Sequence, residues 1–385
     1  MKRKRNIALL GSTGSIGRQT LEVVSEYPDL FQAWVLVANN SADLLIEQAL
    51  KYAPQMVVIA NEAHYEKVKS ALAHTHIEVQ AGSQAVAECV TAPEIDIVVT
   101  AMVGYSGLEP TIKAIEAGKP IALANKETLV VAGELITRLL KSSSSVLYPV
   151  DSEHGAFYQC LIGERHEDIN KLILTASGGP FRTFPIEKLT HVTAADALKH
   201  PNWDMGAKIT IDSATMINKG FEVIEAKWLF GVEADNIEVL VHPQSIVHSA
   251  VQFADGAVKA QLGVPDMRLP IQYAFSYPDR LTLSSSRLDL FAHPLEFFRP
   301  DLEKFRCLAL SFEAIKKGGN MPCILNAANE VVNRAFLDDR CGFLQIADTI
   351  ERTMNKVAFD PSPDYDIYIS TDREARRVAA EILSL

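Results

Sequence analysis

The chain has few cysteines, and their spacing matches no metal-binding or disulfide pattern. The five are an odd number without a Cys-x-x-Cys pair: Cys89, Cys160, Cys307, Cys323 and Cys341. This excludes a disulfide framework and a zinc knuckle. It predicts reduced thiols in a cytoplasmic protein.

Long apolar runs and excess positive charge are also lacking. The longest apolar runs, such as residues 95–101, are strand-sized, whereas a membrane helix needs ~20 residues. The apolar stretch behind the basic opening ends at Gly11, so we expect no cleavable leader. The net charge of −11 argues against a nucleic-acid or anionic-membrane partner. We expect a soluble protein that binds anionic ligands through local groups.

Short β-branched segments alternate with helical segments in the first 150 residues. The expected strands cover residues 6–10, 34–37, 56–59, 95–100, 120–123 and 146–150. This alternation predicts an α/β fold with a doubly wound, Rossmann-like parallel sheet. Ligands bind such sheets at the carboxyl ends of the strands. The residues that follow each strand are therefore the first candidates for a site.

The pattern changes after residue 150. Strands are expected at 239–241, 246–253 and 257–262, and Asp255-Gly256 predicts an antiparallel hairpin between the last two. This indicates a second, α+β domain, followed by a small helical domain with helices at 325–336 and 373–385. We expect a cofactor domain at 1–150, a catalytic domain at 151–276, a linker at 277–303 and a helical domain at 304–385.

A glycine-rich turn follows the first expected strand and opens a helix. Its sequence runs from Gly11 through Thr13, Gly14, Ser15 and Ile16 to Gly17. Glycines in this context let the backbone approach a pyrophosphate at the helix N-terminus, although a turn that only packs the helix is the alternative. After the second strand the chain has Asn39, Asn40 and Ser41 instead of the acid that NAD-preferring proteins use. This favours NADPH over NADH, although no arginine is present to grip the 2′-phosphate.

Acidic residues follow a later strand of the same sheet. Asp151 and Glu153 lie two apart in a segment expected to be extended, which would point both carboxylates to one face. A third acid comes from an expected helix at 215–230, where Asn218, Lys219 and either Glu222 or Glu225 lie opposite an apolar stripe. All-oxygen ligands suit Mg²⁺ or Mn²⁺ better than zinc. Ordinary surface acids are the alternative interpretation.

Two polar turns are candidates for binding phosphate. They are residues 175–180 and 212–215, and Ser213 is placed to cap the helix that carries Asn218 and Lys219. The segment 200–206 carries a tryptophan and a methionine in an expected loop, which predicts either a core plug or a lid over substrate. His242 and His248 are read as ordinary strand histidines.

These motifs together resemble one family, 1-deoxy-D-xylulose 5-phosphate reductoisomerase, over nearly the whole chain. The matching segments are GSTGSIG at Gly11, LANKE at Leu123, PVDSEH at Pro149, SGGPF at Ser177, HPNWDMG at His200, DSATMINKGFEVIEA at Asp212, HPQSIVHS at His242 and LNAANE at Leu325. Many members have a glycine, a basic residue and asparagine where this chain has Asn39, Asn40 and Ser41.

The resemblance implies the site residue by residue. Asp151, Glu153 and Glu222 would hold Mg²⁺ or Mn²⁺, with Co²⁺ as a third candidate. The substrate phosphate would be bound by Ser177, Ser213, Asn218 and Lys219, with His248 nearby. Lys126 and Ser152 would approach the sugar oxygens, and His200, Trp203 and Met205 would lie on the closing loop. NADPH would contact Thr13, Gly14, Ser15, Ile16, Asn125, Glu127 and Gly206.

The resemblance further implies a homodimer that rearranges and reduces a small phosphorylated sugar. The product would be 2-C-methyl-D-erythritol 4-phosphate, a precursor of isoprenoids. Lys126 and His200 join the three metal ligands as the expected catalytic residues. Two rival hypotheses are an NADP-dependent oxidoreductase without isomerisation, which would need no metal, and an inactive dinucleotide-sensing protein, which would bind NADPH without oxidising it.

Overall fold

The computed structural model describes residues 3–199, 206–292 and 294–385. The chain forms two compact units, and each has its own hydrophobic core. Unit 1 consists of Met1–Thr128, Ile136–Gly155 and Asp266–Ser285, and unit 2 consists of Leu129–Leu135, Ala156–Pro265 and Ser286–Leu385.

Unit 1 is built on a sheet of seven parallel strands, which confirms the predicted doubly wound fold. The order is β4-β3-β2-β1-β5-β6-β7. The strands are β1 (Arg5–Leu10), β2 (Phe31–Ala38), β3 (Met56–Ile59), β4 (Glu78–Ala81), β5 (Ile97–Thr100), β6 (Ile121–Leu123) and β7 (Leu147–Pro149). The sequence does not predict β4, because this strand is short and largely polar. The strand order reverses between β1 and β5, and ligands bind such sheets at this switch point.

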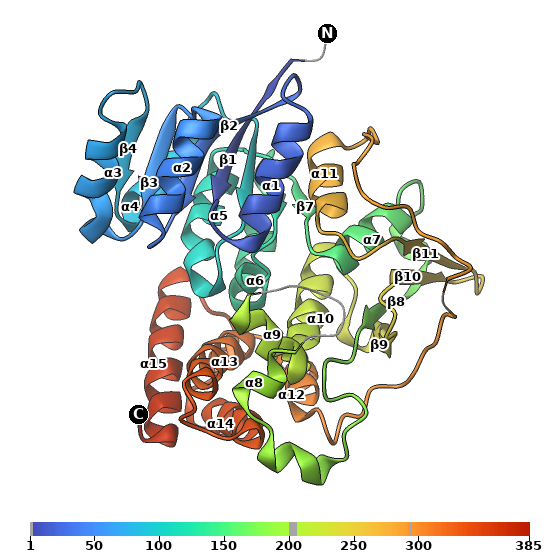
Figure 1. The fold of residues 1–385 in the computed structure, drawn as a ribbon. Helices are drawn as coiled ribbons and strands as arrows, with labels where there is room; N and C mark the ends of the chain where they lie inside the picture. Colours follow the sequence, from blue (N-terminus) through green and yellow to red (C-terminus); the bar gives the residue numbers. More distant parts are fainter. Residues whose placement is uncertain (1–2, 200–205, 293) are drawn as a thin grey trace. The chain divides into compact units, whose positions relative to one another are not determined.

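Helices join the strands of unit 1 (Figure 1). They are α1 (Ser15–Glu26), α2 (Ala42–Tyr52), α3 (Tyr65–Leu72), α4 (Ser83–Glu88), α5 (Leu108–Glu116) and α6 (Glu127–Lys141), of which Leu129–Leu135 belongs to unit 2. Unit 1 also contains α11 (Arg268–Ser276), which joins no two of its strands. Although α11 comes late in the chain, it packs on α1, and Phe275 lies 5.6 Å from the Phe31 ring. This packing is why 266–285 belongs to the first compact unit. The predicted domain boundaries at 150, 276 and 303 stay a prediction.

Unit 2 contains a four-stranded sheet in the order β11-β10-β8-β9. Its strands are β8 (Ile169–Ala176), β9 (Ile237–Val241), β10 (Val247–Phe253) and β11 (Val258–Leu262). The antiparallel pairing of β10 and β11 confirms the predicted hairpin. The sequence does not predict β8, which pairs parallel with β9 and antiparallel with β10. Residues that follow β8 and β9 therefore meet at one edge of this sheet.

Helices form the rest of unit 2, and those of the C-terminal part confirm the predicted helical region. They are α8 (Ala194–Ala197), α9 (Ala207–Ala214), α10 (Ile217–Phe230), α12 (Arg306–Lys317), α13 (Met321–Leu337), α14 (Phe343–Lys356) and α15 (Tyr365–Leu383). Figure 1 shows α13, α14 and α15 packed together in red and orange. Helix α7 (Ser152–Cys160) begins in unit 1 and continues into unit 2. None of the described helices is both long and apolar enough to cross a membrane.

Candidate active site

The glycine-rich turn lies between β1 and α1, at the switch point of the first sheet. Gly11 has φ +89°, and a Cβ there would lie 2.5 Å from the carbonyl oxygen of Ala101. A Cβ on Gly17 would lie 2.2 Å from the carbonyl oxygen of Gly11. Both contacts are with backbone, so only glycine fits at these two positions. Gly14, the N-cap residue of α1, offers no side chain to the helix N-terminus, which leaves that end suited to an anion.

The residues after β2 are exposed and uncharged. Asn39, Asn40 and Ser41 follow the strand directly, and Ser41 is the N-cap residue of α2. Asn61 donates from Nδ2 to Oδ1 of Asn40 at 2.8 Å, which ties this turn to the end of β3. The ribose end of a dinucleotide would therefore meet amides and a hydroxyl here.

Asn125 fixes the backbone beside the same sheet edge. Its buried amide donates to the carbonyl oxygens of Met102 and Gly104 at 2.8 and 3.0 Å and to Glu127 Oε2 at 3.0 Å. A Cβ on Gly107 would lie 2.2 Å from Asn125 Oδ1, so the glycine is needed for this approach. The sequence marks Asn125 as a residue after a strand but does not reveal that its side chain holds a second turn.

The adjacent strands β6 and β7 bring Lys126 and Asp151 together. Both side chains are largely buried and form an ion pair. Parallel strands end at the same edge, so the sequence-based prediction that these segments share a rim is confirmed. Burying a carboxylate is costly unless a cation is close, and Lys126 provides one.

Glu153 reaches this region from a helix. The segment was expected to be extended, but α7 begins at Ser152, so the argument from alternating strand residues is wrong. Ser152 Oγ donates a hydrogen bond to Glu153 Oε2. Asp151 precedes the helix and Glu153 lies in its first turn, where a negative charge is favoured by the helix dipole.

A second glycine turn follows β8 in unit 2. Gly178 and Gly179 both have positive φ, +85° and +68°. A Cβ on Gly179 would lie 2.7 Å from the carbonyl oxygen of Ser213. The backbone amide of Gly179 donates to Ser177 Oγ at 3.2 Å. This close approach sets the turn that carries Ser177 against the last turn of α9, which carries Ser213.

The expected single helix at 215–230 is wrong in its start. α9 ends at Ala214 and α10 begins at Ile217, and the two residues between them are Thr215 and Met216, of which Met216 has φ +60°. Ser213 lies inside α9, and the N-cap residue of α10 is Met216, which makes no side-chain capping bond. The prediction that Ser213 caps α10 is therefore wrong, although Ser213 lies only four residues before the start of that helix.

α10 is buried around most of its circumference, whereas the sequence predicts one apolar stripe and one polar face. Glu222 and Glu225 are about equally buried, at 1% and 0% exposed, so burial does not distinguish between them. Lys219 Nζ forms an ion pair with Glu222, and Asn218 Nδ2 donates to the same carboxylate. These three residues form one connected group in unit 2.

Gly220 explains a close approach that the sequence indicates. A Cβ at this position would lie 2.0 Å from Oγ of Ser311 on α12. The prediction that something lies close to this glycine is confirmed, and the neighbour is another helix.

The two histidines of the second sheet have different surroundings. His242 Nε2 accepts from the amide of Ile246 at 3.2 Å, and Nδ1 lies 2.8 Å from the carbonyl oxygen of Glu296, so Nδ1 carries the proton. This is the structural role that the sequence favours. Burial, with a smaller contribution from the charge of Lys219, lowers the pKa of His248 to about 4, although a hydrogen bond with the backbone of Val264 opposes the shift. His248 is therefore a neutral imidazole in the electrostatic range of Lys219.

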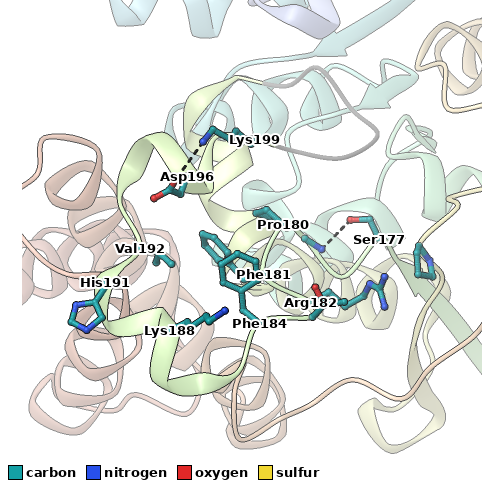
Figure 2. A pocket seen from close by; sticks show the side chains of 13 residues that line it. Ser177, Pro180, Phe181, Arg182, Phe184, Lys188, His191, Val192, Asp196 and Lys199 are labelled. Atoms are coloured by element: carbon teal, nitrogen blue, oxygen red, sulfur yellow. Dashed lines mark hydrogen bonds and ion pairs between the residues drawn. The ribbon is translucent and has the colours of Figure 1, made fainter.

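A pocket of about 670 Å³ lies beside Ser177 (Figure 2). Figure 2 shows Phe181 and Phe184 in its centre, with Lys199 next to Asp196 at one side. Lys188 is exposed and makes no ion pair with any residue that the structure describes. The expected loop residues His200, Trp203 and Met205 lie outside the described residues. Gly206 is exposed and is the N-cap residue of α9.

The fold and these side chains define a dinucleotide-binding enzyme. A glycine cradle lies at the switch point of a parallel sheet, and a buried Lys126–Asp151 ion pair lies at the same edge. Family models match residues 7–133, described as 1-deoxy-D-xylulose 5-phosphate reductoisomerase, and residues 147–230 and 262–378, described as C-terminal domains of that enzyme.

Individual relatives match the chain from end to end. The reductoisomerase of Bacteroides thetaiotaomicron is 62% identical over 382 residues, covering 99% of this chain and 98% of the relative. The Porphyromonas gingivalis enzyme is 57% identical over 380 residues, with coverage of 99% and 98%. The chain belongs to the 1-deoxy-D-xylulose 5-phosphate reductoisomerase family, as the sequence motifs predict.

Solved structures of the family share the fold. The Zymomonas mobilis enzyme in complex with NADPH has a TM-score of 0.92 at 40% identity and covers 99% of both chains. A reductoisomerase in complex with NADPH, fosmidomycin and magnesium has a TM-score of 0.93 at 36% identity, covering 99% of this chain and 98% of that one.

Proposed function

We propose that this chain rearranges and reduces 1-deoxy-D-xylulose 5-phosphate to 2-C-methyl-D-erythritol 4-phosphate, with NADPH and a divalent metal, in non-mevalonate isoprenoid biosynthesis. The observation that carries the proposal is the buried Lys126–Asp151 pair at the carboxyl edge of a nucleotide-binding sheet, in a chain that matches named reductoisomerases over 99% of its length. The predicted class, an NADPH-dependent oxidoreductase, agrees with these relatives.

NADPH fits the glycine turn of unit 1. The turn residues Gly11 and Gly17 leave no room for side chains, and the first turn of α1 supplies unblocked amides for the pyrophosphate. We assign Thr13, Gly14, Ser15, Ile16, Asn125, Glu127 and Gly206 to the cofactor. Asn39, Asn40 and Ser41 receive the ribose end, where the lack of an acid accommodates a 2′-phosphate.

The metal ligands are Asp151, Glu153 and Glu222. Each is a carboxylate, and an all-carboxylate donor set fits Mg²⁺, with Mn²⁺ as the alternative. Asp151 and Glu222 are each accompanied by a lysine, Lys126 and Lys219, within their own unit. A divalent ion bound there would polarise the ketone of the sugar.

The substrate phosphate is held by Ser177, Ser213, Asn218 and Lys219. Two observations support this: Gly179, two residues after Ser177, approaches the carbonyl of Ser213, and Asn218 and Lys219 are consecutive residues of α10. The neutral imidazole of His248 adds a hydrogen-bonding group without a charge. Because the phosphate is remote from the reacting carbons, its binding energy positions the sugar for reaction.

Lys126 and Ser152 act at the sugar oxygens. The Lys126 ammonium stabilises negative charge that develops on these oxygens, and its burial strengthens that effect. His200, Trp203 and Met205 cover the substrate and exclude water. The enzyme works as a cytoplasmic homodimer, and five free thiols suit a reducing compartment.

The test is NADPH consumption with 1-deoxy-D-xylulose 5-phosphate, with and without Mg²⁺. We expect turnover that stops when the metal is chelated and returns when it is restored. Turnover that persists in chelator would favour an oxidoreductase without isomerisation, and NADPH binding without oxidation would favour a sensor protein.

A single substitution separates metal binding from cofactor binding. Asp151→Asn keeps the size of the side chain but removes its charge, so metal-dependent turnover should be lost while NADPH affinity stays close to that of the wild type. Normal turnover in this variant would contradict the metal assignment.

A further inference from the structure

Helix α13 carries three asparagines on a buried face. Asn326, Asn329 and Asn333 are each at most 1% exposed, and they follow one another at the spacing of helical turns. Burying an amide is unfavourable unless it makes hydrogen bonds. The Oδ1 atoms of all three lack a hydrogen-bond partner among the described residues, so their Nδ2 groups make the hydrogen bonds that offset the burial of these amides.

Two of these asparagines converge on one buried carboxylate. Asn329 Nδ2 and Asn333 Nδ2 donate to Oδ1 of Asp212 at 2.8 and 2.7 Å, and Asn333 Nδ2 also lies 3.0 Å from the carbonyl oxygen of Lys208. Lys208 Nζ forms an ion pair with Asp212 Oδ2 at 2.9 Å. We call Lys208, Asp212, Asn329 and Asn333 the Asp212 cluster. Asp212 is 1% exposed, so these partners replace water around its charge.

The Asp212 cluster lies next to the residues assigned to the substrate phosphate. Asp212 directly precedes Ser213 in the last turn of α9. The Ser213 carbonyl is the atom that Gly179 approaches, and Met216, with φ +60°, leads directly from this turn into α10. A shift of the last turn of α9 would therefore move Ser213 and displace the start of α10.

We propose that Asp212, Asn329 and Asn333 are positioning residues for substrate binding. Their hydrogen bonds link α9 to α13 and so keep Ser213 next to the glycine turn at Gly178 and Gly179. They also fix the start of α10, which carries Asn218 and Lys219. This inference rests on the proposed function, because it takes these residues as the phosphate site. It assigns a role in substrate binding to Asn329, within the LNAANE segment, and to Asn333, one helical turn later, although both lie far along the chain from the other site residues.

The same helix supplies a matched control. Asn326 is as buried as Asn329 and also has an Oδ1 atom without a partner among the described residues, but its Nδ2 donates to Glu330 at 3.2 Å. Replacing Asn326 by alanine therefore removes a buried amide from α13 without touching Asp212. If the loss of any buried amide from α13 impairs substrate binding, alanine at position 326 should have the same effect as alanine at 329 or 333. If positioning through Asp212 is responsible, only the substitutions at 329 and 333 should impair binding.

The experiment compares Asn329→Ala, Asn333→Ala and Asn326→Ala by steady-state kinetics, with NADPH binding used to count folded enzyme. Losing a hydrogen bond to a charged group should raise the KM for the phosphosugar about tenfold in the first two variants. The kcat and the NADPH affinity should stay within about threefold of the wild type, because the reacting groups and the cofactor turn are unchanged. The KM of Asn326→Ala should stay within about twofold.

Ser213→Ala separates this inference from the proposed function. A raised KM in Ser213→Ala with an unchanged KM in both Asn329→Ala and Asn333→Ala overturns the positioning role alone. An unchanged KM in Ser213→Ala overturns the phosphate assignment on which the inference rests. An equal rise in KM in Asn326→Ala also overturns the positioning role, since it would show a general effect of α13.

Discussion

Replacing Gly220 by alanine tests how closely α10 and α12 are packed. Helix propensity alone would favour alanine by about 1 kcal/mol in the middle of a helix. The added Cβ, however, would lie 2.0 Å from Oγ and 2.4 Å from Cβ of Ser311, far inside contact distance. Overpacking a core costs about 1–3 kcal/mol. Because the contact is so short, we expect a net destabilisation of about 1–2 kcal/mol, opposite in sign to the propensity.

The assay is thermal unfolding of Gly220→Ala, Ser311→Gly and the double variant. Ser311→Gly removes both atoms that the new Cβ meets, so the double variant should recover much of the stability lost in Gly220→Ala. This coupling is the expected result for residues in direct contact. A higher unfolding temperature for Gly220→Ala than for the wild type would refute the packing argument, as would additive effects in the double variant.

Three further predictions follow from burial and close contacts. The pKa of His248 is lowered from 6.5 to about 4, so between these pH values the unfolded state binds the proton more tightly than the folded state. The free energy of unfolding should therefore fall as the pH drops from 6.5 to about 4, by up to about 3 kcal/mol. Urea unfolding of His248→Gln should show a smaller loss over the same pH range. Gly17→Ala should weaken NADPH binding at least about tenfold in a fluorescence titration, because its Cβ would meet backbone of Gly11 and Ser12 at 2.2 and 2.6 Å, and full affinity would contradict the cradle. Burial raises the pKa of Cys89 and Cys307 to about 12, so an aromatic disulfide should label these thiols at about pH 8 only after denaturation, and rapid labelling of the native protein would count against their burial.

The first sheet could be predicted from the sequence because its strands are short apolar runs separated by helical segments. Once the strands were placed, the parallel topology put the segments after them on a common edge. That reasoning correctly paired the region of Lys126 with the region of Asp151. It failed for the local geometry of Glu153, because a short polar segment can either end a strand or begin a helix, and here α7 begins at Ser152.

In unit 2, hydrophobic periodicity does not predict where α10 begins or how deeply its polar residues are buried. The sequence predicts one helix from Thr215 to Phe230, but Met216 has a left-handed backbone conformation, which a methionine side chain does not favour and which the pattern therefore does not indicate. The polar face expected on α10 is largely buried, since Lys219, Glu222 and Glu225 are at most 5% exposed, and α12 approaches the helix on another side, at Gly220. Periodicity places Glu222 and Glu225 alike, so only the family resemblance chooses between them.

Glu222 is the carboxylate of α10 that we assign to the divalent ion. The measurement is Mn²⁺ binding by isothermal titration calorimetry to the wild-type enzyme with NADPH, and to Glu222→Gln and Glu225→Gln. Losing one ligand of a three-carboxylate site should weaken binding by at least about tenfold in Glu222→Gln, while Glu225→Gln should stay close to the wild type. Wild-type affinity in Glu222→Gln, together with lost affinity in Glu225→Gln, would contradict the assignment.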